Sequence, residues 1–312
     1  MSDAASLIAV RRALLSRLGR YQAWAVVEKQ IVERLRACFA AHPPSLRRID
    51  LHTPPAILEQ IVKYEAVHAI RGDADLRRRL QDDRRCYALF SAALPGQPLI
   101  FIEMAFTRGI CGDVSSLLDT ESPVVEPKSC DCGTFYSISS CDEGLRGIPF
   151  GNALIRAVVE QLRHETPWVG TFATVSPVPG FRTWLEEVAR RRGGVLLEAF
   201  DALSERAWME DPALSRRLEA LLMPACAAYL VSAKRGDEPL DPVARFHLGN
   251  GARLERINWL GDRSPAGLQR SAGIVANYVY DLPSVDSNQH AYRTAHRIAT
   301  ATALTELAQR AA

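Results

Sequence analysis

The spacing of apolar residues over the first eighty positions predicts helices. Between residues 14 and 39 apolar side chains recur every three or four positions among charged ones, at Leu18, Trp24, Val27, Ile31 and Leu35. This period is typical of an amphipathic helix, and the His-Pro-Pro at 42–44 should end it. Thr53 followed by two prolines predicts a second helix that runs to about Ala69. A short basic helix is expected at 75–80.

From residue 85 the pattern changes to short apolar runs separated by proline and glycine, which predicts strands. Residues 85–91 and 99–106 flank the turn at 94–98 and indicate a hairpin, and residues 134–140 indicate a third strand. A Gly-rich loop at 142–152, an amphipathic helix at 153–163 and a strand at 172–175 complete the middle of the chain.

Helical periodicity returns at 212–233, where leucines mark an apolar face. The segment 243–252 concentrates polar and tightly turning residues, His247 and Asn250 among glycines. Strands are expected at 254–260 and 272–280, and a closing helix at about 288–310.

Composition and charge limit the classes of molecule that the protein is expected to bind. The chain has 312 residues, 47% of them hydrophobic, with 38 basic against 36 acidic residues, so no charge excess suggests nucleic acid or an anionic membrane. No apolar run approaches the roughly 18 to 20 residues that span a bilayer, and the first residues lack the pattern of a signal peptide. We expect a cytoplasmic protein with a small-molecule partner.

The seven cysteines form an odd, scattered set, which predicts reduced thiols rather than a disulfide framework. Cys130, Cys132 and Cys141 raise the alternative of a zinc site. No further Cys-x-x-Cys or histidine pair completes four ligands nearby, so we expect no metal. An exposed, oxidisable Cys130/Cys132 pair is the other alternative.

Two polar residues, Ser176 and His247, are candidate catalytic residues. Ser176 begins Ser-Pro-Val-Pro-Gly, in which two prolines fix φ and Gly180 permits a reversal, so the serine should sit on a stiff corner. An ordinary turn into a helix near Thr183 is the alternative. His247 precedes Asn250 in a run of glycines, and a histidine with a purely structural role is the alternative there.

The Gly-rich loop follows a strand and opens a helix. Gly144, Gly147 and Gly151 let the main chain approach a ligand closely, and backbone N–H groups at a helix N-terminus attract phosphate. A plain connector is the alternative, but the order of strand, loop and helix favours a phosphate site.

Several segments, colinear from about residue 48 to the C-terminus, together resemble the malonyl-CoA decarboxylase family. They are Lys63-Tyr-Glu-Ala-Val-His-Ala-Ile70, Asp83-Arg-Arg-Cys-Tyr87, Phe135-Tyr-Ser-Ile-Ser139, Gly144-Leu-Arg-Gly-Ile-Pro-Phe-Gly151, Val175-Ser-Pro-Val-Pro-Gly-Phe181, Arg245-Phe-His-Leu-Gly-Asn-Gly-Ala252, Arg256-Ile-Asn-Trp259 and Ala276-Asn-Tyr278. The resemblance implies an α+β fold of the GNAT-like acyltransferase type over residues 48–312, with a mixed central sheet flanked by helices. Residues 1–47 would be a short helical remnant of the family's larger N-terminal domain, which takes part in subunit contacts.

The resemblance also implies a reaction, the loss of CO2 from malonyl-CoA to give acetyl-CoA, and a place in fatty acid metabolism. Carried over by residue, it makes Ser176 and His247 catalytic. It places the coenzyme A pyrophosphate on the Gly-rich loop, and three further residues, Asn250, Asn277 and Tyr278, either line the acyl end or are structural. The loop residues concerned are Leu145, Arg146, Gly147, Ile148, Phe150, Gly151 and Asn152. Pro149 departs from relatives that carry an acidic residue there.

The chemistry needs no metal or organic cofactor, because a malonyl thioester already contains its electron sink. The protein must orient the carboxylate, stabilise the enolate and supply a proton. We expect His247 to donate a hydrogen bond and Ser176 to position the acyl group and relay the proton, although the two roles could be exchanged. Ser176 lacks the Gly-x-Ser-x-Gly elbow of an α/β-hydrolase.

Alternatives remain open at this point. The same fold could act on malonyl groups carried by an acyl carrier protein, as a decarboxylase or acyltransferase. An amine acyltransferase and a non-catalytic coenzyme A-binding protein are the other classes. A homo-oligomer is compatible with the resemblance, and neither the oligomeric state nor the acceptance of methylmalonyl-CoA follows from the sequence.

Overall fold

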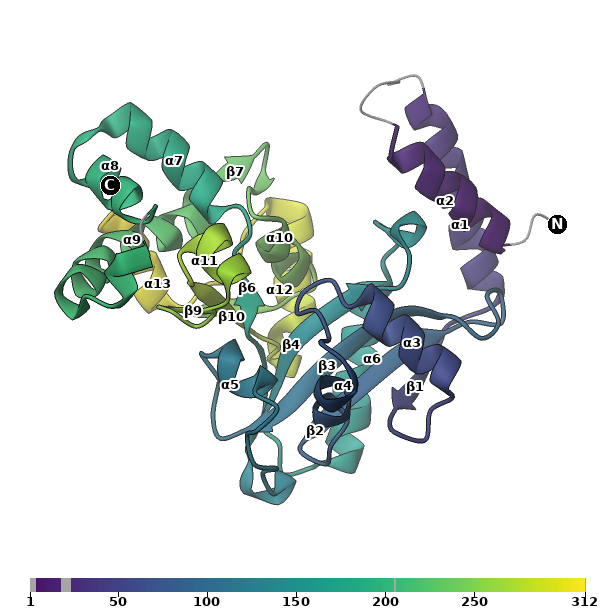
Figure 1. Ribbon diagram of the computed structural model, residues 1–312. Helices are drawn as coiled ribbons and strands as arrows, with labels where there is room; N and C mark the ends of the chain where they lie inside the picture. Colours follow the sequence, from purple (N-terminus) through teal and green to yellow (C-terminus); the bar gives the residue numbers. More distant parts are fainter. Residues whose placement is uncertain (1–3, 18–23, 205, 312) are drawn as a thin grey trace. The chain divides into compact units, whose positions relative to one another are not determined.

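The chain folds into two compact units, each built from more than one segment (Figure 1). The computed structural model describes residues 4–17, 24–204 and 206–311. The first unit comprises Met1–Phe106, Pro123–Cys130 and Phe135–Val169, and the second comprises Thr107–Ser122, Asp131–Thr134 and Gly170–Ala312. The predicted division at residue 47 stays a prediction.

The first unit combines a sheet of order β1-β2-β3-β4 with helices. β1 pairs antiparallel with β2, which pairs antiparallel with β3, so the predicted hairpin is confirmed. β1 was not predicted. The elements of this unit are α1 (Ala4–Leu15), α2 (Ala25–Ala41), β1 (Ser45–Ile49), α3 (Pro55–Tyr64), α4 (Asp73–Arg79), β2 (Arg84–Phe90), β3 (Pro98–Thr107), η2 (Pro127–Ser129), β4 (Cys132–Ser140), η3 (Glu143–Leu145) and α6 (Phe150–Glu165).

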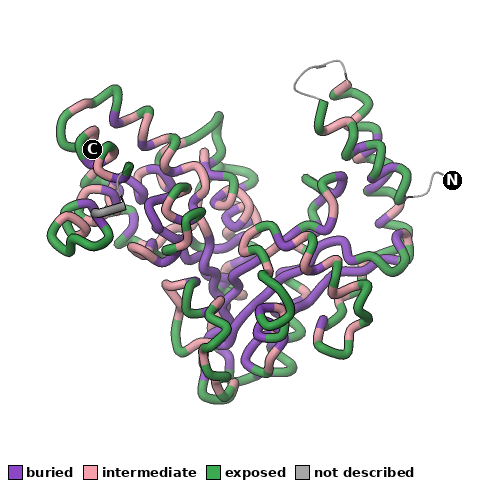
Figure 2. Tube along the Cα trace, in the orientation of Figure 1, coloured by how far each residue is buried: buried purple, intermediate pink, exposed green. Residues whose placement is uncertain are grey.

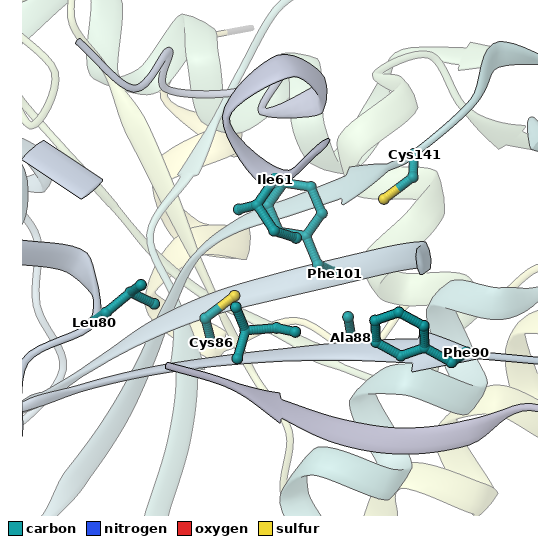
Figure 3. Packing of buried hydrophobic residues seen from close by; sticks show 8 residues of the cluster. Ile61, Leu80, Cys86, Ala88, Phe90, Phe101 and Cys141 are labelled. Carbon is teal, nitrogen blue, oxygen red and sulfur yellow. The ribbon is translucent and has the colours of Figure 1, made fainter. Parts of the chain in front are cut away.

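An apolar cluster holds α3 on the strands of this unit. Ile61 is fully buried beside Phe101 of β3. The cluster also contains three side chains of β2 and one each from β1, the end of α4 and the end of β4: Cys86, Ala88, Phe90, Ile49, Leu80 and Cys141 (Figure 3). Strands β2 and β3 are buried along nearly their whole length (Figure 2), which explains their near-continuous apolar sequence.

In the second unit β10 (Val275–Val279) is the central strand. It pairs antiparallel with β5, β6 and β9, with an irregularity in the β9 register between Asn277 and Tyr278. Together with the strands of the first unit this confirms the predicted α+β class. The other elements are α5 (Val114–Leu118), β5 (Thr171–Thr174), β6 (Ser176–Pro177), α7 (Phe181–Arg192), α8 (Gly194–Ala202), η4 (Arg206–Met209), α9 (Pro212–Ser232), β7 (Lys234–Arg235), β8 (Glu238–Pro239), α10 (Pro242–Gly249), β9 (Arg253–Asn258), α11 (Pro265–Ser271), α12 (Leu282–Ala295) and α13 (Thr302–Gln309).

The predicted helix over residues 14–39 is wrong at its start. α1 ends at Leu15, and α2 begins at Ala25. The Ser16 hydroxyl donates to the carbonyl of Ala13, a local hydrogen bond that competes with the helical ladder. Leu18, which was expected on the apolar face, lies outside the described residues.

The second predicted helix is shorter than expected. α3 ends at Tyr64 rather than near Ala69, because the Glu65 carboxylate accepts hydrogen bonds from the N–H groups of Val67 and His68. This fixes a turn in place of another helical turn. Thr53 does not cap α3, since its hydroxyl accepts from the N–H of Asp50.

The predicted closing helix is two helices, α12 and α13. His296 ends α12 in the left-handed region, with φ of 49°. The next residues pair with β9, where the N–H of Leu254 donates to the carbonyl of Ala299 and the N–H of Ala301 donates back to the carbonyl of Leu254.

The cysteines are free thiols. Cys130 and Cys132 are both buried, so the exposed pair considered above is not present. No helix within the described ranges is both long and apolar enough to cross a bilayer.

Candidate active site

Ser176 is held at the junction of two strands in the second unit. β5 ends at Thr174, and Ser176 opens β6, where it pairs with Ala276 of β10. Gly180 then caps the start of α7. The corner between these elements is therefore fixed by backbone pairing on one side and a helix on the other, and only 5% of Ser176 is exposed.

His247 comes from the last turn of α10. The helix begins with Asp241 as N-cap and Pro242 in the first turn, a favourable helix start. Its Nε2 atom lies 3.1 Å from the Ser176 Oγ atom, although 71 residues separate the two in sequence. The structure therefore brings together the two residues that the sequence singled out.

The direction of the Ser176–Thr174 hydrogen bond sets the state of the imidazole, because the donor and acceptor roles in the two contacts of the ring follow from it. The Ser176 hydroxyl donates to Thr174 Oγ1 at 2.8 Å, so its proton is not available to His247. The contact at Nε2 then needs an N–H donor on the ring. His247 Nδ1 lies 2.8 Å from the Tyr280 hydroxyl, which donates to it. The neutral imidazole consequently carries its proton on Nε2.

The surroundings of His247 favour the neutral ring. Burial lowers the pKa of His247 from 6.5 to about 3, because desolvation penalises the charged form. The ring stacks on Tyr278 with centroids 4.6 Å apart and meets the edge of Phe246 at 5.0 Å. An uncharged imidazole at neutral pH is thus a hydrogen-bond donor at Nε2 and an acceptor at Nδ1.

Asn277 uses its whole amide inside the protein. Its Nδ2 group donates to the carbonyls of Thr174 and Cys111, and its Oδ1 atom accepts from Arg256 Nε at 2.9 Å and Asn258 Nδ2 at 2.7 Å. This side chain therefore ties β10 to β5, to β9 and to the segment near residue 111. Its predicted contact with the acyl group stays a prediction.

Tyr278 and Asn250 differ in their surroundings. Tyr278 is fully buried, its N–H donates to Thr174 Oγ1 at 3.1 Å, and its hydroxyl has no hydrogen-bond partner among the residues that the structure describes. Asn250 is half-buried at the C-terminus of α10, where its N–H donates to the carbonyl of Phe246. Tyr278 supports the imidazole ring, and the substrate contacts predicted for both stay predictions.

The Gly-rich loop belongs to the first unit and joins η3 to α6. Leu145, Ile148, Phe150 and Gly151 are buried, Asn152 is half-buried, and Arg146 and Gly147 are exposed. Gly147 has φ of 77°, which suits glycine. The α6 N-cap is Pro149, which provides no side-chain cap for this 16-residue helix, and the N–H of Phe150 donates to the carbonyl of Ile148.

α1 fastens the beginning of this loop. Arg11 Nη1 donates to the carbonyl of Gly144 at 2.8 Å, and its Nη2 atom pairs with Glu28 at 2.6 Å. Arg12 pairs with Asp142 at 2.9 Å. The two contacts to the loop could not be predicted from the sequence, because Arg11 and Arg12 stand 133 and 130 positions before Gly144 and Asp142.

Sequence reasoning also missed Thr174, Tyr280 and Asp241. The strand period places the first two near the site, since residues two apart on a strand face the same side, but it assigns them no role. Thr174 stands two before Ser176, and Tyr280 stands two after Tyr278. Asp241 stands before the segment 243–252, and nothing local marks it as part of a site.

Comparison with known proteins places the chain in one family. The family described as "Malonyl-CoA decarboxylase C-terminal domain" matches residues 44–312. The mitochondrial malonyl-CoA decarboxylase of Anser anser anser is 36% identical over 273 residues, which cover 80% of this chain and 54% of that protein. The Rattus norvegicus protein of the same name is 34% identical over 80% of this chain and 56% of its own length. The chain thus spans about half the length of these curated relatives.

Solved structures match a larger share of this chain and of their own chains than the curated relatives do. The crystal structure of malonyl-CoA decarboxylase from Rhodopseudomonas palustris is 41% identical, with a TM-score of 0.91, and the match covers 97% of this chain and 75% of that one. The one from Agrobacterium vitis is 39% identical, with a TM-score of 0.90 and the same coverage. The two units together reproduce the fold of these proteins, and the chain belongs to the malonyl-CoA decarboxylase family.

Proposed function

We propose that this chain converts malonyl-CoA to acetyl-CoA and CO2. Family membership supports the reaction class. The observation that carries the proposal is the 3.1 Å contact between Ser176 Oγ and His247 Nε2, because it joins a hydroxyl and a neutral imidazole donor in one place.

The substrate itself supplies the electron sink. As the C–C bond to the carboxylate breaks, CO2 leaves and the electron pair moves into the thioester, whose oxygen carries the enolate charge. We therefore propose a reaction without metal or organic cofactor. The protein has to orient the carboxylate out of the thioester plane and place donors at the developing oxyanion, each worth roughly 3 to 4 kcal/mol in comparable sites.

His247 fits the donor role in this scheme. A ring whose pKa burial lowers to about 3 can offer the Nε2 proton as a neutral donor to the carboxylate or to the enolate oxygen once the substrate replaces Ser176 as its acceptor. An imidazolium is not required. Tyr280, whose hydroxyl lies 2.8 Å from Nδ1, can donate to the unprotonated nitrogen of this tautomer.

Ser176 fits the relay role. Its hydroxyl accepts from His247 and donates to Thr174, so a proton passed from Ser176 to the α carbon can be replaced along the same chain. The reaction consumes one proton in total, and water must supply it. A serine whose proton is directed away from the imidazole is poorly set up as a nucleophile.

Coenzyme A binding is proposed at the loop of the first unit. The uncapped start of α6 supports a pyrophosphate site, because helix N-terminal N–H groups bind anions. The residues concerned remain Leu145, Arg146, Gly147, Ile148, Phe150, Gly151 and Asn152. Asn250, Asn277 and Tyr278 remain the candidates around the acyl end.

A cytoplasmic location, a role in fatty acid metabolism and a homo-oligomeric state are part of the same proposal. The curated relatives carry the word mitochondrial in their names, so cell fractionation should decide the location. Light scattering of the purified protein should decide the number of subunits.

The test is incubation with malonyl-CoA in D2O, followed by mass spectrometry. We expect acetyl-CoA with one deuterium in its methyl group, and CO2 in equal amount. Unchanged malonyl-CoA would contradict the proposal, and transfer of the intact malonyl group to an added amine without CO2 release would favour an acyltransferase.

Two substitutions test the assigned residues. His247→Ala and Ser176→Ala should each lower kcat by about 10²- to 10⁴-fold, the usual contribution of a positioned acid or base. His290→Ala is the matched control, because it removes an exposed imidazole of the same unit. Turnover that survives in either site variant would remove that residue from the mechanism.

A further inference from the structure

Asp241 joins the two elements that carry the reacting pair. We propose that this carboxylate is a positioning residue, which sets the distance between Ser176 and His247 by holding the serine corner and the start of α10 at one point. The inference rests on the proposed function, because its kinetic effect is read from decarboxylation. Asp241 is fully buried.

One oxygen of Asp241 holds the histidine helix. Oδ1 accepts hydrogen bonds from the N–H groups of Val243 and Ala244, both at 2.9 Å. These are the amides that an N-cap satisfies. Since His247 lies on the same short helix, the place where the helix begins determines where its imidazole lies.

The other oxygen holds the serine corner. Oδ2 accepts from the Tyr229 hydroxyl at 3.2 Å and from the N–H of Gly180 at 3.5 Å. Gly180 ends the Ser-Pro-Val-Pro-Gly corner, and the prolines at 177 and 179 leave little freedom between it and Ser176. A displacement of Gly180 should therefore also displace Ser176.

Tyr229 makes this junction tight. Its ring packs against Phe181 and Trp184 of α7, with centroids 5.9 and 5.3 Å away, and a Cβ atom at Gly180 would overlap its hydroxyl. Glycine is needed at 180 because of this close approach. Its backbone conformation does not require glycine, because a φ of −93° is open to any residue. The corner, α9 and α10 thus meet at a single buried carboxylate.

Asp241→Asn separates the two roles of the carboxylate, which are to cap α10 and to accept hydrogen bonds from Tyr229 and Gly180. The asparagine oxygen can still cap α10, whereas its NH2 group would face two donors, the Tyr229 hydroxyl and the Gly180 N–H. We expect kcat for malonyl-CoA to fall on the order of 10- to 100-fold, as displacements near 1 Å do, with KM within about twofold of the wild type.

The matched control is Asp211→Asn. Asp211 precedes Pro212 and caps α9 through the N–H groups of Ala213 and Leu214, so it repeats the local Asp-Pro helix start at an exposed position. This variant should leave kcat and KM within about twofold. Equal losses of kcat in the two variants, or an unchanged kcat in Asp241→Asn, would overturn the inference.

A second pair of variants covers the case in which Asp241→Asn does not fold. Gly180→Ala should lower kcat, because the new methyl group pushes the corner away from Tyr229. Adding Tyr229→Phe removes the hydroxyl in its path and should recover part of the loss. A double variant no faster than Gly180→Ala would contradict the inference.

Nitrogen NMR of the His247 ring gives a readout that does not depend on turnover. Its signals are identified by their loss in His247→Gln. We expect the ¹⁵N shifts to move in Asp241→Asn and to stay in Asp211→Asn, and unmoved shifts in Asp241→Asn would refute the positioning role. If the wild type releases no CO2, the proposed function fails, and this measurement still tests the geometry.

Discussion

Ser176 and His247 share a hydrogen bond in which the imidazole is the donor. In a serine hydrolase the imidazole accepts the serine proton, and a carboxylate on its other nitrogen supports the positive charge that forms. Here the Ser176 proton points to Thr174, and a tyrosine hydroxyl, not a carboxylate, faces Nδ1. The arrangement suits donation to an anionic substrate in a buried place, which is what enolate formation requires.

Thr174 keeps this polarity, and its replacement should reverse it. Thr174→Val retains the shape of the side chain but removes the acceptor of the Ser176 proton, so the hydroxyl should turn to Nε2 and favour the Nδ1–H tautomer. We expect kcat to fall by about tenfold or more, with KM for malonyl-CoA little changed. Steady-state kinetics and the ¹⁵N shifts of the His247 ring measure the two effects.

Thr174→Ser is the control for this prediction. It restores the hydroxyl and should keep most of the wild-type kcat. If the serine and valine variants lose activity equally, the packing of the threonine methyl group matters and the hydrogen-bond direction does not.

For single residues, the sequence predicts the pair Ser176 and His247 but not the residues that hold this pair in position. Ser176 and His247 lie in motifs that resemble a known family, so they could be named in advance. Tyr280 stands 33 residues after His247, and Asp241 stands 6 residues before it. Their roles depend on strand and helix geometry that only the folded chain provides. The four hydrogen bonds of Asn277 likewise involve partners from three separate segments.

Among the elements, α10 shows how local reasoning fails. Its sequence has two glycines and an asparagine near the end and was interpreted as a run of tight turns, yet residues 242–249 are helical. The helix is stable because its end is held from outside. Gln289 of α12 donates to the carbonyl of Gly249 and Asn288 donates to that of Gly251.

The break between α12 and α13 has a similar cause. No proline or glycine interrupts residues 288–310, so periodicity predicts one helix. The carbonyl and N–H of Leu254 on β9 bind the intervening residues instead. Such long-range pairing overrides helix propensity, whereas the hairpin of β2 and β3 has its turn signals in the sequence and was predicted.

Gly251 should be the most sensitive position at the end of α10. Its φ is 84°, and a Cβ atom there would overlap the carbonyl oxygen of Val285 in α12. Gly251→Ala should therefore lower the free energy of unfolding by more than the roughly 1 to 2 kcal/mol of a left-handed alanine. Urea unfolding followed by tryptophan fluorescence measures this change.

Gly249→Ala is a control only two residues away. It lies within α10, and its new Cβ would meet Tyr292 at an ordinary 3.6 Å. A helical alanine should be neutral or stabilising by up to about 1 kcal/mol. If the two variants were equally stable, the contact between the turn and α12 would not limit the position of α10.

Over the whole molecule, ionisable groups are buried in both units, with different consequences. In the first unit the buried guanidinium of Arg79 has two carboxylate partners, Asp75 at 2.7 Å and Glu103 at 2.9 Å. In the second unit His247 is buried without an ion-pair partner in the part of the chain described, and desolvation is the cause of its pKa shift. The resemblance identified the family from colinear motifs, but protonation states follow only from packing.

The buried imidazole predicts a loss of stability in acid. In the unfolded chain a histidine binds a proton below a pH of about 6.5, whereas folded His247 does so only below about 3. Between these values the unfolded state holds more protons, so the free energy of unfolding falls as the pH falls. At one pKa unit per about 1.4 kcal/mol, the loss attributable to His247 should be roughly 2 kcal/mol at pH 5.

His247→Gln removes this titration and should flatten the decline between pH 6.5 and 3. The comparison is the free energy of unfolding in urea at several pH values, for wild type, His247→Gln and His290→Gln, which lacks an exposed imidazole of the same unit. We expect the gap between wild type and His247→Gln to change with pH by the amount given above and the His290→Gln curve to run parallel to the wild type. A pH-independent gap for His247→Gln would mean that the folded protein accepts a proton on this ring, and a charged imidazolium would then have to replace the neutral donor in the proposed mechanism.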